Sequence, residues 1–213
     1  MQSLDRVDFS NNWTTLVFLL CLLLLVVLKT INPQKLFEYS RAFILKGFIA
    51  DKAQERAAFF SVFNLSFYLF SILIYALLLT YLTPILSSDT HIDFKLYLKI
   101  TFLVFVYFSA FKIVDFLLCN LFEIRPHLSV LMAAKSGYTY NISLLLFPLL
   151  AFAVYSFLHV YVLLIALILF FTLSFVLMIV NNKNLIVSKL FYFILYLCAL
   201  EITPLLIIYK ITA

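Results

Sequence analysis

Three ionisable side chains lie within stretches of sequence that are otherwise as apolar as a membrane interior. Lys112 and Asp115 share one such stretch, and Glu201 lies in another. A charge at the centre of a bilayer costs at least about 2.5–3.5 kcal/mol on insertion scales, so such residues usually have a partner or a function. Lys112 and Asp115 are three residues apart, which places them on one face of a helix and lets them pair directly. We call these three residues the charge cluster.

The depths of these residues allow the cluster to form. At 1.5 Å per residue, Lys112 lies roughly 13 Å from the end of its apolar stretch near Leu121, and Glu201 lies roughly 19 Å from the start of its stretch near Ser188. A lysine side chain covers much of this difference. With all three groups ionised the net charge would be −1, which favours one protonated carboxyl group. The alternatives are an interhelical lock, a path for protons or ions, and Asp115 reaching the headgroups on its own.

Pro204 follows Glu201 by one helical turn. Proline has no N–H, so it leaves the carbonyl group of Leu200 without its helical donor and bends the helix. A free carbonyl beside a carboxylate is the local chemistry of a cation or water site. Most proline kinks in membrane helices are nevertheless packing features.

A polar stripe in the apolar segment 57–82 is the second candidate site. Its members recur every three or four residues and therefore share one face of a helix: Ser61, Asn64, Tyr68, Ser71 and Tyr75. Hydrogen bonds from such a face to neighbouring helices contribute about 0.6 kcal/mol each inside a membrane. The stripe indicates helix packing, contact with another membrane protein, or the lining of a polar cavity.

The sequence contains none of the common catalytic or metal-binding motifs, such as HExxH, GxSxG or a Walker loop. Its three histidines are widely separated, and its three cysteines stand singly in apolar segments. We therefore expect a protein that is not an enzyme and that binds neither a metal nor a cofactor.

The elements that must position these residues are membrane-spanning helices. Hydrophobic residues make up 66% of the chain and charged residues 12%, whereas soluble domains average about 45–50% and about 25%. A membrane core of about 30 Å takes roughly 20 helical residues to cross. Six continuous apolar segments are about that long: 13–31, 57–82, 98–121, 141–158, 160–180 and 188–209.

This pattern predicts an all-α polytopic membrane protein, a bundle of six transmembrane helices that forms a single domain over residues 1–213. The fourth and fifth segments are separated only by His159, which predicts a tight antiparallel hairpin. One long interrupted helix is the competing interpretation. Glycine occurs only at positions 47 and 137, outside the predicted spans, so no GxxxG motif is available for helix packing.

The basic residues predict the orientation of the chain. Ten of the fifteen Lys and Arg residues lie in one set of loops, four lie on the other side, and Lys112 lies within a span. The positive-inside rule then places the long first loop in the cytoplasm and both termini in the periplasm. The net charge of +5 is explained in the same way and gives no reason to expect nucleic acid binding.

The first loop contains an interfacial segment over residues 33–52. Large apolar residues are mixed there with four basic ones: Lys35, Arg41, Lys46 and Lys52. A segment of this kind can lie in the headgroup layer, where each basic residue gains about 1 kcal/mol from anionic lipid. We expect a surface helix that ties the first two spans together, or a docking surface for a partner.

The run from Phe191 to Leu206, followed by Tyr209 and Lys210, resembles the end of a family of polytopic inner-membrane proteins. That family is an uncharacterised one, a domain of unknown function found in Bacteroidota. The resemblance implies a location in the bacterial cytoplasmic (inner) membrane. It implies no activity, cofactor or catalytic residue.

Small size, scarce glycine, abundant aromatic residues and the basic loop favour a non-enzymatic subunit or accessory factor of a bacterial envelope complex. Secretion, export and trans-envelope machines are examples. Its expected partners are membrane lipids and other inner-membrane proteins. One alternative is a small proton-coupled carrier or channel that uses the charge cluster. Another is an accessory protein that binds a lipid-linked substrate in aromatic grooves.

Overall fold

The computed structural model describes residues 12–40, 61–86, 92–121, 125–156 and 160–181. The regular elements in these residues are all helices: α1 (Asn12–Ile31), α2 (Pro33–Ser40), α4 (Val62–Leu86), α5 (Phe94–Leu121), α6 (Arg125–Tyr155) and α7 (Val160–Asn181). The predicted all-α class is confirmed.

Four of these helices contain stretches that are long and apolar enough to cross a membrane: Trp13–Ile31, Val62–Pro84, Phe94–Val114 and Lys135–Tyr155. A shorter apolar stretch, Tyr161–Leu177, lies in α7. Such helices fit a protein embedded in a membrane. The predicted sixth segment, 188–209, lies outside the described residues, so the bundle of six spans stays a prediction.

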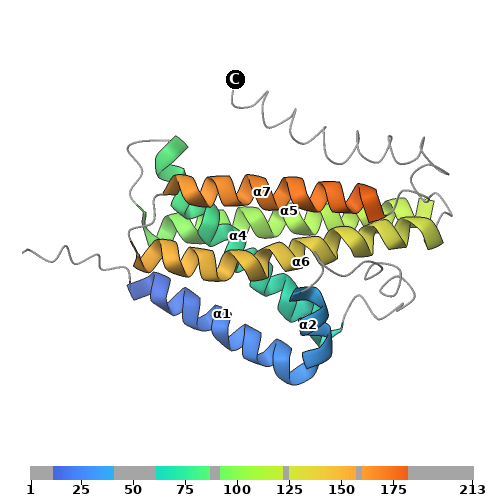
Figure 1. The fold of residues 1–213 in the computed structure, drawn as a ribbon, viewed down its shortest axis with the longest axis horizontal. Helices are drawn as coiled ribbons and strands as arrows, with labels where there is room; N and C mark the ends of the chain where they lie inside the picture. Colours follow the sequence, from blue (N-terminus) through green and yellow to red (C-terminus); the bar gives the residue numbers. More distant parts are fainter. Residues whose placement is uncertain (1–11, 41–60, 87–91, 122–124, 157–159, 182–213) are drawn as a thin grey trace, which may run out of the picture.

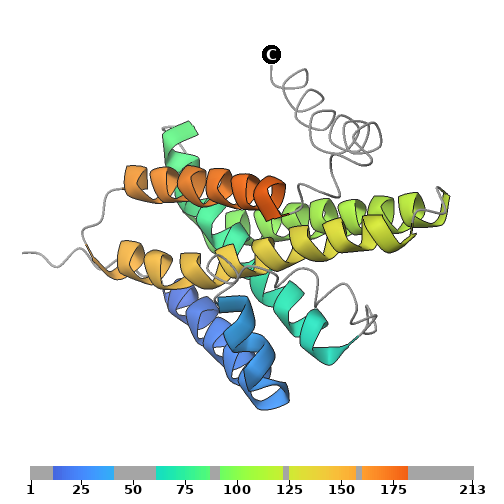
Figure 2. The same cartoon turned by 45° about the vertical axis from the view of Figure 1, so that its right-hand side comes forward.

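Helix α4 is the central element of the described structure. It packs against α1, α5, α6 and α7, and it passes obliquely through the middle of the molecule (Figures 1 and 2). In its candidate span 67% of the residues are buried, compared with 11% in the span of α5. Among the described helices the core is therefore built around α4, and α5 lies at the edge with most of the span Phe94–Val114 left uncovered.

Helices α6 and α7 form the predicted antiparallel hairpin. Helix α6 ends at Tyr155, α7 begins at Val160, and the two pack side by side with opposite directions (Figure 1). One interrupted helix, the competing interpretation, does not describe this arrangement.

Helix α6 begins much earlier than the predicted span 141–158. It starts at Arg125, and its candidate span starts at Lys135, so a stretch assigned to a loop is helical. The physical reason is that the end of this stretch packs inside the bundle rather than facing water. Gly137, Tyr138 and Tyr140 are all buried.

The corner between α1 and α2 is sharp because Asn32 and Pro33 define it. The backbone N–H of Lys35 donates to the side-chain oxygen of Asn32 (3.0 Å), which makes Asn32 the N-cap of α2. Proline suits the first helical position because it has no N–H to leave unsatisfied. The described part of the predicted interfacial segment is therefore a short helix, which packs against α6 and buries Tyr39.

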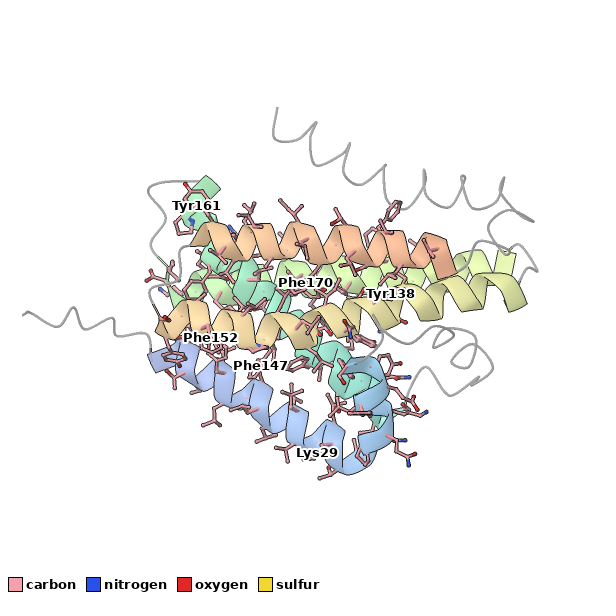
Figure 3. All side chains as sticks on the ribbon, in the orientation of Figure 1. Lys29, Tyr138, Phe147, Phe152, Tyr161 and Phe170 are labelled. Carbon is pink, nitrogen blue, oxygen red and sulfur yellow. The ribbon has the colours of Figure 1, made fainter. Side chains whose placement is uncertain are left out.

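Aromatic side chains gather at one end of the bundle. The ring of Trp13 lies 5.4 Å from the ring of Tyr97 and 6.0 Å from that of Phe94, counted between centroids. Tyr161 lies at the same end, whereas Lys29 lies toward the opposite end (Figure 3). Trp and Tyr are enriched where helices meet the membrane–water boundary. This end has the composition of such a boundary.

Because α4 is central, replacing phenylalanine by alanine should affect the free energy of unfolding much more on α4 than on α5. Phe70 is fully buried against the rings of Phe67 and Phe147, whereas Phe102 on α5 is 70% exposed. Phe70→Ala should lower the free energy of unfolding by about 3 kcal/mol or more, because it leaves a cavity. Phe102→Ala, the matched control, should change it little. Thermal unfolding of both variants in detergent checks this expectation, and equal losses would contradict the central role of α4.

Candidate functional site

The polar stripe of α4 faces the neighbouring helices. The hydroxyl groups of Tyr68 and Ser109 on α5 are hydrogen-bonded (2.8 Å), and those of Ser71 and Ser143 on α6 are hydrogen-bonded (3.0 Å). Both bonds join residues that lie far apart in the sequence. Helix α4 is therefore fixed to α5 and α6 by polar contacts as well as by apolar packing.

The remaining stripe residues divide between two roles. The hydroxyl group of Tyr75 donates to the backbone carbonyl of Thr139 on α6 (3.2 Å), which adds a third bond across helices. Ser61 immediately precedes α4 and accepts a hydrogen bond from the backbone N–H of Asn64 (3.3 Å), the geometry of an N-cap. Ser61 thus caps the start of α4, and Tyr75 fixes the later part of α4 to α6.

We define the polar seam as the residues that make the three bonds between helices: Tyr68, Ser71, Tyr75, Ser109, Thr139 and Ser143. Ser71 and Ser143 are completely buried. Burying a hydroxyl group without a partner costs about 1–3 kcal/mol in proteins. Both serines also lie within hydrogen-bond distance of a carbonyl group of their own helix, Ser71 of Phe67 (2.9 Å) and Ser143 of Tyr140 (2.8 Å). The register of the three helices is therefore held mainly by the longer side chains of Tyr68 and Tyr75, whose hydroxyl groups bond to α5 and α6.

Lys112 lies at one end of this seam. Its Nζ is 3.8 Å from the ring centroid of Tyr68, a cation–π contact of about 0.5–2 kcal/mol. Asp115 lies one turn further along α5, but its side chain is outside what the structure describes. Glu201 and Pro204 are outside the described residues altogether. The charge cluster and the proline kink therefore stay predictions.

Lys135 is a second lysine at the seam, and the sequence analysis placed it in a loop. Its Nζ is buried and lies 5.1 Å from the ring centroid of Phe111 on α5. The sequence contains a pattern that could have placed Lys135 on a helix. Lys135, Thr139 and Ser143 recur every four residues and form a polar stripe on α6 that matches the stripe on α4.

Asn141 is another buried polar residue that the sequence analysis missed. Its side-chain amide donates a hydrogen bond to the backbone carbonyl of Tyr39. Tyr39 lies in the last turn of α2, where carbonyl groups have no partner within the helix. Asn141 therefore caps α2 from α6, and the ring of Tyr39 packs 5.8 Å from that of Tyr140 beside it.

The basic residues of the interfacial segment are only partly described. Lys35 lies on α2 and is half-buried, whereas Arg41, Lys46 and Lys52 lie outside the described residues. The docking role of this segment stays a prediction. In the described part of the chain, no group of three or more His, Cys, Asp or Glu side chains is placed to hold a metal ion.

The helices and the polar seam define an all-α protein whose four long apolar helices fit a membrane-embedded chain. A family model described as a domain of unknown function (DUF4271) matches residues 14–212, and the chain belongs to this family. The resemblance to an uncharacterised domain family is thereby confirmed, while the bacterial group and the inner membrane stay predictions. No curated protein and no solved structure matches the chain.

The contact between Asn141 and Tyr39 predicts that one side chain on α6 holds α2 in place. Asn141→Ala should destabilise the docked state of α2 by about 1–2 kcal/mol, because the carbonyl group of Tyr39 loses its donor. Hydrogen–deuterium exchange of the amides in Pro33–Ser40 should then become several times faster. Asn64→Ala is the matched control. Unchanged exchange in the Asn141 variant would contradict the capping role.

Proposed function

We propose that this protein is a non-enzymatic integral subunit of a bacterial envelope complex, and that it docks to its partner through the exposed face of α5. The main support is the position of α5 at the edge of the bundle. Only 11% of its span is buried, although the helix is 28 residues long. A helix with so little cover has the surface that a neighbouring membrane protein would need.

The chemistry of the exposed faces favours α5 over α1 as the docking surface. The exposed side chains of α1 between Leu16 and Val26 are aliphatic, as expected for contact with lipid tails. The exposed side chains of α5 include Phe102, Phe105 and Tyr107. Aromatic residues are enriched at protein–protein interfaces, where they fill pockets at low entropic cost.

The non-enzymatic assignment is supported by what the described polar groups do. The hydroxyl groups of Tyr68, Ser71 and Tyr75 are each engaged in a hydrogen bond that packs α4 against its neighbours. Groups committed to packing are poorly placed to bind and release a substrate. The polar seam thus fits a rigid structural subunit better than a carrier that changes shape.

The proposal includes an orientation. Lys29 at the end of α1 and Lys35 on α2 lie at the long first loop, residues 32–56, which contains five of the fifteen basic residues of the chain. The positive-inside rule favours the cytoplasm for that end of the bundle and the periplasm for the end that carries Trp13. The cytoplasmic membrane of a bacterium is the location that fits this charge distribution and the family resemblance.

Photocrosslinking in living cells tests the docking face. A photoreactive amino acid in place of Phe102 should give a crosslinked product of one defined mass, because this position faces the partner. The same amino acid in place of Leu19 on α1, which is 63% exposed, should give none. Mass spectrometry of the product identifies the partner.

Two results would contradict the proposal. The first is the absence of a protein crosslink at Phe102, or an equal pattern of products at Leu19. The second is a protein that purifies alone and carries protons across liposome membranes in a manner abolished by Glu201→Gln. That second result would favour the proton-coupled carrier.

A further inference from the structure

The exposed face of α5 carries one continuous stripe of residues. The buried residues Tyr97 and Val104 mark the side of α5 that packs against the other described helices. The opposite side of the helix carries residues that recur every three or four positions and are all exposed: Lys95, Lys99, Phe102, Val106, Ala110 and Ile113. We call these residues the outer stripe.

The outer stripe is long enough to contact a whole membrane-spanning helix. Its ends, Lys95 and Ile113, are 18 residues apart, which corresponds to about 27 Å along α5. The hydrocarbon core of a membrane is about 30 Å thick. The small side chain of Ala110 lets a neighbouring helix approach closely within this length. The stripe therefore has the dimensions of a contact between two helices.

Two lysines are unusual on a helix face that contacts only lipid tails. Lys95 and Lys99 lie inside the candidate span Phe94–Val114, and both are exposed. Charged residues in membrane spans mostly face the interior of a bundle and pair with an opposite charge. These two lie instead on the outer side of α5, in line with Phe102, which is 70% exposed. Their position favours an opposite charge that comes from outside the described bundle.

The end of the outer stripe that contains the lysines is positively charged. Lys95 and Lys99 are one helical turn apart, so both ammonium groups can reach the same neighbouring side chain. Asp93 immediately precedes α5 and offsets at most one of the two charges. Asp93 is also two positions from Lys95, a spacing that does not bring two side chains together on a helix. A partner helix with an acidic residue at this level is therefore complementary to the stripe.

We propose that the outer stripe binds one transmembrane helix of the partner, and that this helix presents an Asp or Glu side chain to Lys95 and Lys99. The apolar residues Phe102, Val106 and Ile113 pack along the rest of that helix. Complementary charges between the two helices fix their register and disfavour helices without the acidic residue. This inference rests on the proposed docking through α5, and it adds the chemistry of the partner.

Zero-length crosslinking in native membranes tests the charge pair. A water-soluble carbodiimide joins a lysine amine to a carboxylate that it contacts, so it should give a product of the same mass as photocrosslinking at Phe102. Lys95→Arg combined with Lys99→Arg keeps both charges but removes both amines. The carbodiimide product should then fall at least threefold, while photocrosslinking at Phe102 stays unchanged. Lys29→Arg at the end of α1 is the matched control and should change neither product.

Removing the two charges tests whether they contribute to docking. Lys95→Gln combined with Lys99→Gln should lower the yield of the photocrosslinked product at Phe102 at least threefold. Lys29→Gln should leave that yield unchanged. A photoreactive amino acid in place of Ile113 should give the same product as one in place of Phe102, because one helix follows the whole stripe.

The failure of this inference differs from the failure of the proposed function. If Phe102 gives no protein crosslink, the docking face is wrong and the acidic helix is wrong with it. If Phe102 gives the product, two results would overturn the inference alone. The first is a carbodiimide product that is missing, or that persists in the arginine variant. The second is a full photocrosslinking yield in the glutamine variant, which would show that the two lysines serve the lipid headgroups.

Discussion

The structure depends on one constraint, which is that the face of α4 with Tyr68, Ser71 and Tyr75 must meet polar groups on α5 and α6. Each of these three hydroxyl groups is hydrogen-bonded to α5 or α6. A bond of this kind contributes only about 0.6 kcal/mol in a membrane, but a mispaired buried hydroxyl group costs more. The seam therefore selects one register among many apolar packings of similar energy. Apolar contact alone would not select this register, because the chain has only two glycines and therefore no GxxxG motif to fix how two helices pack.

The same constraint explains why α6 is long and why α2 is docked. The polar residues Lys135, Thr139, Asn141 and Ser143 would be costly to bury against lipid, but here they contact α5, α4 and α2. Asn141 continues the pattern by capping the carbonyl group of Tyr39 at the end of α2. Once α4, α5 and α6 are held in this way, Lys112 lies over the ring of Tyr68 on α4 and Lys135 over the ring of Phe111 on α5. The exposed face of α5, which we propose as the docking face, is left uncovered by the other described helices.

The helical class, the α6–α7 hairpin and the polar stripe of α4 were predictable, because continuous apolar runs and spacing of three or four residues reflect local geometry. The start of α6 was not, since a hydropathy average counts Lys135 and Gly137 as loop residues although the structure buries Gly137 and the Nζ of Lys135. Their role depends on a matching stripe on α4, and a window along the chain does not compare two distant segments. Lys112 was singled out as a residue of interest, whereas Lys135 on α6, which lies over the ring of Phe111 on α5, was missed for the same reason.

Disulfide crosslinking in native membranes tests the polar seam most directly. The experiment uses a variant in which the native cysteines are replaced by alanine, with Ser71→Cys and Ser143→Cys added. The two side-chain oxygens are 3.0 Å apart, so a mild oxidant should crosslink α4 to α6 in high yield. Moving the first cysteine to the exposed position Leu69 should abolish the crosslink. If the Ser71 and Ser143 positions fail to crosslink, or the Leu69 control crosslinks equally well, the register described here is wrong.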